Sequence, residues 1–135
     1  MSVKYTEAHL QALVVKQLRA FGWTVHGDQN AAKRTMYQAM QAKRTGMQKG
    51  WPDICVLLPE GKTLWIELKL KGNYATPEQK ALHEVMRSLG HLVFIVTAEN
   101  PNHAVEQVFH LLKAKDQPSL ASQKLASALP FDPIP

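Results

Sequence analysis

Three charged residues, Asp53, Glu67 and Lys69, lie at the edges of two short apolar segments in the middle of the chain. Carboxylate oxygens suit Mg²⁺ and Mn²⁺, and two acids held side by side repel each other unless a cation lies between them. A lysine beside such an ion can orient a water molecule or neutralise charge that develops on a phosphate. These three side chains therefore have the composition of a hydrolytic metal site, provided that the fold brings them together.

The segments around these residues predict a β-hairpin. Residues 54–58 and 63–70 have the composition of strands, and the sequence Pro-Glu-Gly at 59–61 has the chemistry of a turn. A three-residue connection fits, with a type I turn that begins at the proline and with Gly61 in the left-handed position. Counting outward from this turn pairs Val56 with Leu64.

The same register decides which side chains share a face of the hairpin. It pairs Asp53 with Glu67, and cross-strand partners lie on one face together with the residues two positions away. Asp53, Glu67 and Lys69 are therefore predicted to converge on one side. The core side is expected to receive the alternate residues Ile54, Val56, Leu64, Ile66, Leu68 and Leu70.

At these residues the chain resembles the PD-(D/E)xK nuclease superfamily. The fuller pattern is similar to the virus-type replication-repair nuclease (VRR-Nuc) domain: Gly50-Trp51-Pro52-Asp53, then Trp65-Ile66-Glu67-Leu68-Lys69, then Thr76-Pro77-Glu78-Gln79. The resemblance covers roughly residues 6–96. It implies an α/β fold with a central mixed β-sheet flanked by helices, the restriction-endonuclease-like core.

The resemblance also implies roles for individual residues. Asp53, Glu67 and the backbone carbonyl of Leu68 would bind Mg²⁺ or Mn²⁺, with Lys69 catalytic. Glu7 is a first-turn acid that the helix dipole favours, but a glutamate on the first helix commonly joins the site in this family. Gln79 forms a capping box with Thr76, whereas the family places a glutamine here in the active site.

The charge distribution favours a polyanionic partner. The net charge is +5, and residues 29–52 contain no acid. We expect the DNA-binding residues to be Lys33, Arg34, Lys43, Arg44, Lys49 and Lys71. The alternative is a solvated helix that packs through Met36, Tyr37 and Met40.

The length of 135 residues indicates one domain, which we place at residues 1–116, with a tail rich in proline, serine and alanine at 117–135. No apolar run reaches the roughly 20 residues that span a bilayer. A single cysteine, Cys55, cannot form an intramolecular disulfide, which fits a reducing cytoplasm. No zinc-ligand or Walker pattern is present.

Periodicity and end signals predict the remaining elements. The first helix is capped by Thr6 and ended by Gly22, and the helix after Thr76 should bury Leu82, Val85, Met86 and Leu89. The segment 91–96 is apolar on both faces, as expected for a strand in the interior of a sheet. We also expect a strand at residues 23–26 and helices at residues 31–45 and 101–115.

These observations predict a metal-dependent, structure-selective DNA endonuclease. Small stand-alone VRR-Nuc proteins resemble Holliday-junction resolvases that act as homodimers, so branched DNA and a homodimer are expected. The candidate dimer contacts are Met36, Tyr37, Met40, Leu120, Leu125 and Phe131. The alternatives are a non-catalytic nucleic-acid-binding module on the same scaffold and a restriction-type nuclease.

Overall fold

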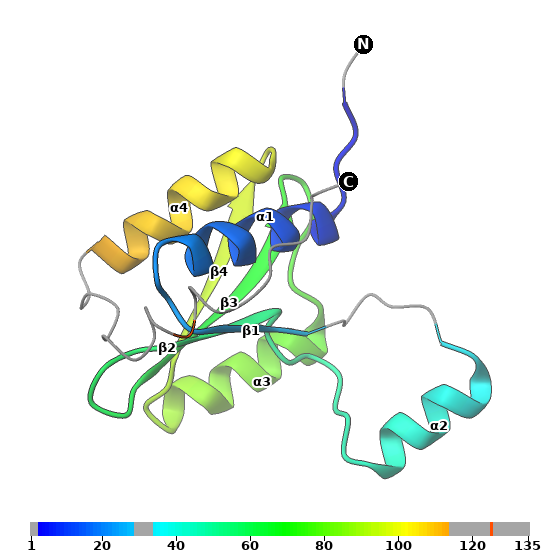
Figure 1. The fold of residues 1–135 in the computed structure, drawn as a ribbon. Helices are drawn as coiled ribbons and strands as arrows, with labels where there is room; N and C mark the ends of the chain where they lie inside the picture. Colours follow the sequence, from blue (N-terminus) through cyan, green and yellow to red (C-terminus); the bar gives the residue numbers. More distant parts are fainter. Residues whose placement is uncertain (1–2, 29–33, 114–124, 126–135) are drawn as a thin grey trace.

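Four strands form one mixed sheet in the order β1-β2-β3-β4 (Figure 1). The structure is a computed structural model that describes residues 3–28, 34–113 and 125. The strands are β1 (Val25–Gly27), β2 (Ile54–Leu57), β3 (Thr63–Leu70) and β4 (Leu92–Ala98). β2 pairs antiparallel with both β1 and β3, whereas β3 and β4 are parallel. The predicted α/β class with a central mixed sheet is confirmed.

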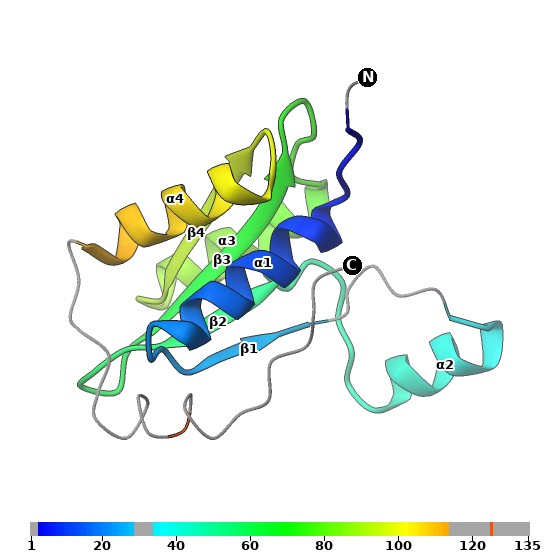
Figure 2. The ribbon, with the colours of Figure 1, turned by 45° about the horizontal axis from the view of Figure 1, so that its top comes forward.

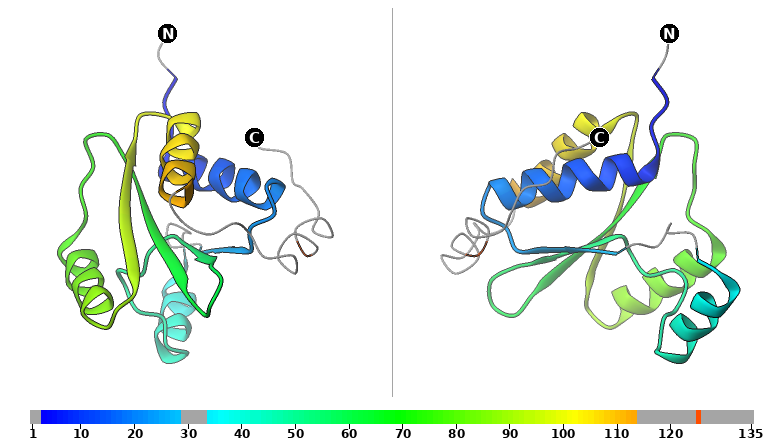
Figure 3. Two further views of the ribbon diagram at one scale, coloured as in Figure 1. Left: turned by 90° about the vertical axis from the view of Figure 1, so that its left-hand side faces the viewer. Right: turned by 45° about the vertical axis from the view of Figure 1, so that its right-hand side comes forward.

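Helices cover the sheet on both faces. One face is covered by α1 (Glu7–Ala20) and α4 (Pro101–Lys113), and the other by α3 (Pro77–Ser88) (Figures 2 and 3). The short helix α2 (Met36–Arg44) projects away from the sheet and buries none of its residues. None of the helices in the described ranges combines the length and apolar character that a membrane crossing requires.

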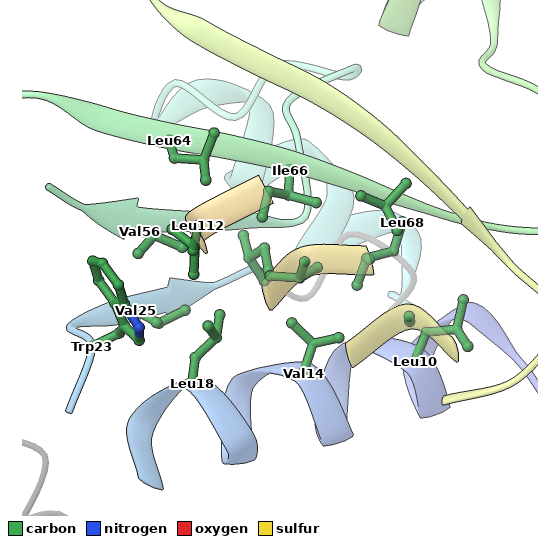
Figure 4. Packing of buried hydrophobic residues seen from close by; sticks show 14 of the residues in the cluster. Leu10, Val14, Leu18, Trp23, Val25, Val56, Leu64, Ile66, Leu68 and Leu112 are labelled. Carbon is green, nitrogen blue, oxygen red and sulfur yellow. The ribbon is translucent and has the colours of Figure 1, made fainter. Parts of the chain in front are cut away.

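The hydrophobic core lies between β2–β3 and the two helices α1 and α4. Leu10, Val14 and Leu18 recur at helical spacing on α1 and are fully buried against the sheet (Figure 4). The predicted inward residues of β2 and β3 are buried in the same cluster, with Leu70 partly buried at its border: Ile54, Val56, Leu64, Ile66 and Leu68. The α4 residues Ala104, Val108 and Leu112 complete the core beside α1, on the same face of the sheet.

The predicted hairpin register is confirmed, because Val56 pairs with Leu64 and Cys55 with Trp65. The turn type differs from the prediction. Gly61 is left-handed as expected, but Glu60 also has a positive φ of 63°. Positive φ at both central positions is the geometry of a type I′ turn, whose twist matches the flanking strands better than type I. The register survives because the loop length is unchanged.

Three other predictions need correction. The second helix begins at Met36 rather than residue 31, because the Thr35 hydroxyl caps it by accepting from the Gln38 N–H. β4 lies at the edge of the described sheet, although helices on both faces still bury Val93 and Val96. On α3 the expected stripe is displaced: Met86 is buried, but the flanking apolar residues Val85 and Leu89 are exposed.

Candidate active site

The carboxyl groups of Asp53 and Glu67 meet on the face of the sheet that α3 covers. Asp53 directly precedes β2, and the register of the hairpin places it opposite Glu67 on β3. The two carboxyl groups are hydrogen bonded to each other. Glu67 is 2% exposed, and Lys69, two residues further along the same face of β3, is 7% exposed. The structure therefore brings together the three residues that the sequence singled out.

Two carboxylates take the place of a strand along one edge of β3. β2 begins at Ile54, which pairs with Ile66, so the N–H groups of Leu68 and Leu70 have no β2 residue opposite them. The Leu68 N–H donates to Asp53 Oδ2 at 2.7 Å, and the Leu70 N–H donates to Glu7 Oε2 at 3.0 Å. Because the N–H and C=O of one strand residue point to the same side, the Leu68 carbonyl also faces this edge.

These bonds place Glu7 at the rim of the site rather than directly between the other acids. Its Oε2 also accepts a hydrogen bond of 3.1 Å from Asn73 Nδ2 in the loop after β3. Its negative charge is nevertheless close enough to contribute to the raised pKa of Glu67. Glu7 therefore joins the start of α1 to the end of β3 and adds negative potential to the site.

The surroundings of Glu67 favour its protonated form. Burial, followed by the hydrogen bond to Asp53 and the negative charge of Asp53, raises its pKa to about 9, although Lys69 opposes the shift. Two adjacent carboxyl groups cannot both ionise at low cost without a compensating cation. A proton on Glu67 thus relieves the repulsion that a divalent cation could relieve instead.

A buried histidine that the sequence did not assign to the site lies against Glu67. His83 of α3 is 1% exposed, and its Nε2 is 3.8 Å from Glu67 Oε1. Burial, Arg87 and Lys69 lower the pKa of His83. The signal available in the sequence was its spacing, because Gln79, His83 and Met86 follow one another at four and three residues and so share one helix face.

The loop that leads into Asp53 packs tightly against the first turn of α3. Gly50 has φ of 100°, and a Cβ added there would lie 2.8 Å from the Glu78 carbonyl oxygen. Pro52 is fully buried. The Asp53 carbonyl accepts a 2.8 Å hydrogen bond from the Asp28 N–H at the end of β1. These contacts set the position at which the Asp53 side chain enters the site.

The predicted capping box at the start of α3 is confirmed. The Thr76 hydroxyl accepts from the Gln79 N–H at 3.2 Å, and Gln79 Oε1 accepts from the Thr76 N–H at 2.9 Å. The amide oxygen of Gln79 is thereby engaged by the backbone. Its amide nitrogen is the group that could donate to a phosphate or a water molecule.

The basic residues are not gathered in one place. Lys43 and Arg44 lie in the last turn of the projecting helix α2, and Lys49 is exposed in the loop before Asp53. Arg34 is exposed just before α2, whereas Lys33 lies outside the described residues. Lys71, at the rim, forms a 3.0 Å ion pair with Glu99, which neutralises part of its charge.

The donor set suits a hard divalent cation that keeps water ligands. Asp53 and Glu67 supply carboxylates, and the buried Glu67 Oε1 has no hydrogen-bond partner within the described residues. Among those residues no three His, Cys, Asp or Glu side chains gather closely enough to bind a metal. A backbone carbonyl and water would therefore complete the coordination, as is common for Mg²⁺.

No protein-family model matches the chain. Its fold, however, is similar to a solved structure described as a "VRR_NUC domain protein", with a TM-score of 0.62 over 84% of this chain and 93% of that one. The chain has the VRR-Nuc fold. A second structure, a "VRR_NUC domain", gives a TM-score of 0.53 over 77% of this chain and 95% of that one. Sequence identities are 20% and 23%, so the likeness concerns the VRR-Nuc fold alone.

A curated phage protein also resembles part of the chain. The "Putative nuclease p44" of Acyrthosiphon pisum secondary endosymbiont phage 1 is 36% identical over 53 residues. The match covers 39% of this chain and 57% of that protein. The resemblance to VRR-Nuc domains that the sequence motifs indicated is thus confirmed for the fold, and the phage protein is named as a nuclease.

Proposed function

We propose that this protein is a metal-dependent DNA endonuclease that hydrolyses phosphodiester bonds. The observation that carries the proposal is the contact between the partly buried Asp53 and the buried Glu67, with Lys69 on the same face of β3. Two acids directly opposite each other on neighbouring strands destabilise a fold, so a binding role explains their presence better than a structural one. The VRR-Nuc fold and the description of the phage relative support the same activity.

The carboxylates of Asp53 and Glu67 and the carbonyl of Leu68 would hold Mg²⁺ or Mn²⁺. Such an ion, when bound, supplies an activated water and stabilises negative charge on a phosphate. The hydrogen bond from the Leu68 N–H holds the Asp53 carboxylate in place without a change in its charge. Preorganisation of this kind lowers the reorganisation needed at the moment of reaction.

Lys69 and Gln79 act on the phosphate and the water. The Lys69 ammonium is mostly withdrawn from solvent, where its positive charge stabilises a developing negative charge more strongly than it would in water. Gln79 donates through its amide nitrogen, because its oxygen is bound to the Thr76 backbone. Glu7 holds the end of β3 through the Leu70 N–H.

The substrate is proposed to be branched DNA, in particular a four-way junction cleaved by a homodimer. Two identical sites related by a two-fold axis match the symmetry of paired cuts in a junction. The exposed apolar residues of α2, Met36, Tyr37 and Met40, supply a surface that a second copy could cover. Lys43 and Arg44 at the other end of α2 would contact phosphates.

The test is cleavage of labelled four-way, flap and linear DNA with Mg²⁺, with Asp53→Asn as the control. Asparagine keeps an oxygen that can accept from the Leu68 N–H, so this variant should fold yet lose activity by about a hundredfold or more. Absence of product on all substrates, with binding retained, would favour the non-catalytic module. A fixed cutting site in linear duplex would favour a restriction-type nuclease, and equal activity in the variant contradicts the proposed site.

A further inference from the structure

Three buried polar atoms without hydrogen-bond partners lie on Glu67 of the acidic pair and on His83, which contacts it. They are Nδ1 and Nε2 of His83 and Oε1 of Glu67, and none has a partner among the described residues. The distance between Nε2 and Oε1 is 3.8 Å, just beyond a hydrogen bond. Buried polar groups are nearly always hydrogen bonded, so this cluster calls for an explanation.

The surroundings of His83 show that it faces the site and not the hydrophobic core. Lys69 and Asp53 are both close enough to act on it electrostatically, as is Arg87 on its own helix. The core cluster, by contrast, is built from α1, α4 and the opposite face of the sheet and does not include His83. An apolar side chain of similar volume would fill this position without leaving polar atoms unpaired.

Glu67 has one contact that it must give up when the site is filled. It is hydrogen bonded to Asp53 in the present arrangement, and a cation between the two carboxylates removes the need for that bond. A shift of less than 1 Å then brings Oε1 within reach of His83 Nε2, because a hydrogen bond requires about 3 Å.

We propose that His83 is a positioning residue whose Nε2–H donates a hydrogen bond to Glu67 Oε1, leaving the other carboxylate oxygen to face the cation. The inference rests on the proposed function, because it assigns His83 to the same metal site. This donor is present in the imidazolium and also in the neutral ring that carries its proton on Nε2. Partners that orient a ligand in this way typically raise metal affinity ten- to a hundredfold.

The test compares the Mn²⁺ affinity of three variants with that of the wild type by calorimetry at one pH. His83→Leu keeps the bulk and removes the donor, whereas His83→Gln restores an N–H at a similar reach. Met86→Leu, at a buried position on the same helix face without a polar group, is the matched control. We expect about tenfold weaker binding for leucine, and affinities within about threefold of the wild type for glutamine and for the control.

The outcomes separate this inference from the proposed function. A wild type that binds no Mn²⁺ overturns both. A wild type that binds Mn²⁺, with His83→Leu folded and equally tight, overturns only the role of His83. Should the leucine variant fail to fold, the ring tautomer of the Mg²⁺-loaded wild type decides, measured by ¹⁵N NMR. A proton on Nε2 supports the inference, and a neutral ring protonated on Nδ1 contradicts it.

Discussion

The Leu68 N–H donates a 2.7 Å hydrogen bond to the Asp53 carboxylate, so one side chain replaces the strand residue that β2 lacks at this point. The same edge of β3 is reinforced further along by Glu7, which accepts from Leu70. The sheet thus opens at the place where two acids and a backbone carbonyl can face a ligand. This opening, rather than the presence of acids alone, is what makes a catalytic site physically reasonable here.

Replacement of the buried acid should change how stability depends on pH. The pKa of Glu67 is about 9 in the folded protein and near 4.5 when unfolded, so folding takes up a proton between these values. The free energy of unfolding should therefore fall as pH rises through this window, by up to about 1.4 kcal/mol per pH unit relative to Glu67→Gln. Urea denaturation from pH 7 to 8.5 with a chelator measures this difference. Parallel curves for the two proteins would contradict the assigned protonation.

Metal binding should release the same proton. Because Glu67 must ionise to bind a cation, the apparent Mn²⁺ affinity should rise by up to about tenfold per unit between pH 6.5 and 8. Calorimetry in two buffers of different ionisation enthalpy should detect close to one proton released per ion. An affinity that does not change with pH, without proton release, would show that the ion binds elsewhere or that Glu67 is already ionised.

Gly50→Ala should destabilise the protein and disturb the site. The added Cβ would lie 2.8 Å from the Glu78 carbonyl oxygen, and φ of 100° is unfavourable for alanine. Gly46 is the matched control, because it has the same φ but no atom within 4 Å of an added Cβ. We expect about 1–3 kcal/mol more loss at position 50 than at position 46 by urea denaturation. Equal losses at the two positions would mean that strain alone matters.

Gln79→Glu separates the two roles of this residue. A glutamate preserves the capping box, since its carboxylate also accepts from the Thr76 N–H, but it cannot donate to a phosphate. The melting temperature should remain close to that of the wild type, while cleavage falls about tenfold or more. A variant with full activity would show that Gln79 acts only as a helix cap.

The projecting helix should matter for DNA and not for folding. α2 buries none of its residues, so Lys43→Ala with Arg44→Ala should leave the free energy of unfolding nearly unchanged. If both contact phosphates, the slope of log affinity against log salt should fall by roughly 2. Alanines at Lys62, in the loop between β2 and β3, and at Lys113, in the last turn of α4, provide the control. Neither of these elements lies beside α2 (Figure 1). A slope that stays the same in the α2 variant would remove these residues from the interface.

The convergence of the acids could be predicted because a hairpin register depends on loop length and alternation, and both are local. The starts of α1 and α3 could be predicted from Thr6 and Thr76, because helix capping is also a local interaction. The edge position of β4 could not be predicted, since helices on both faces bury Val93 and Val96 whether or not a further strand lies beside them. His83 was missed because only the tertiary contact between α3 and β3 shows what it faces. Four further expectations lie outside the described residues: the domain boundary at residue 116, the DNA-binding role of Lys33, and the dimer candidates Leu120 and Phe131.

The most direct measurement is a crystal structure of the protein soaked with Mn²⁺, with anomalous scattering used to locate the ion. We expect a peak bound by the carboxylates of both Asp53 and Glu67, at the edge of β3 beside Leu68. Crystals that show no peak there at millimolar Mn²⁺, with the two carboxyl groups still hydrogen bonded to each other, would contradict it.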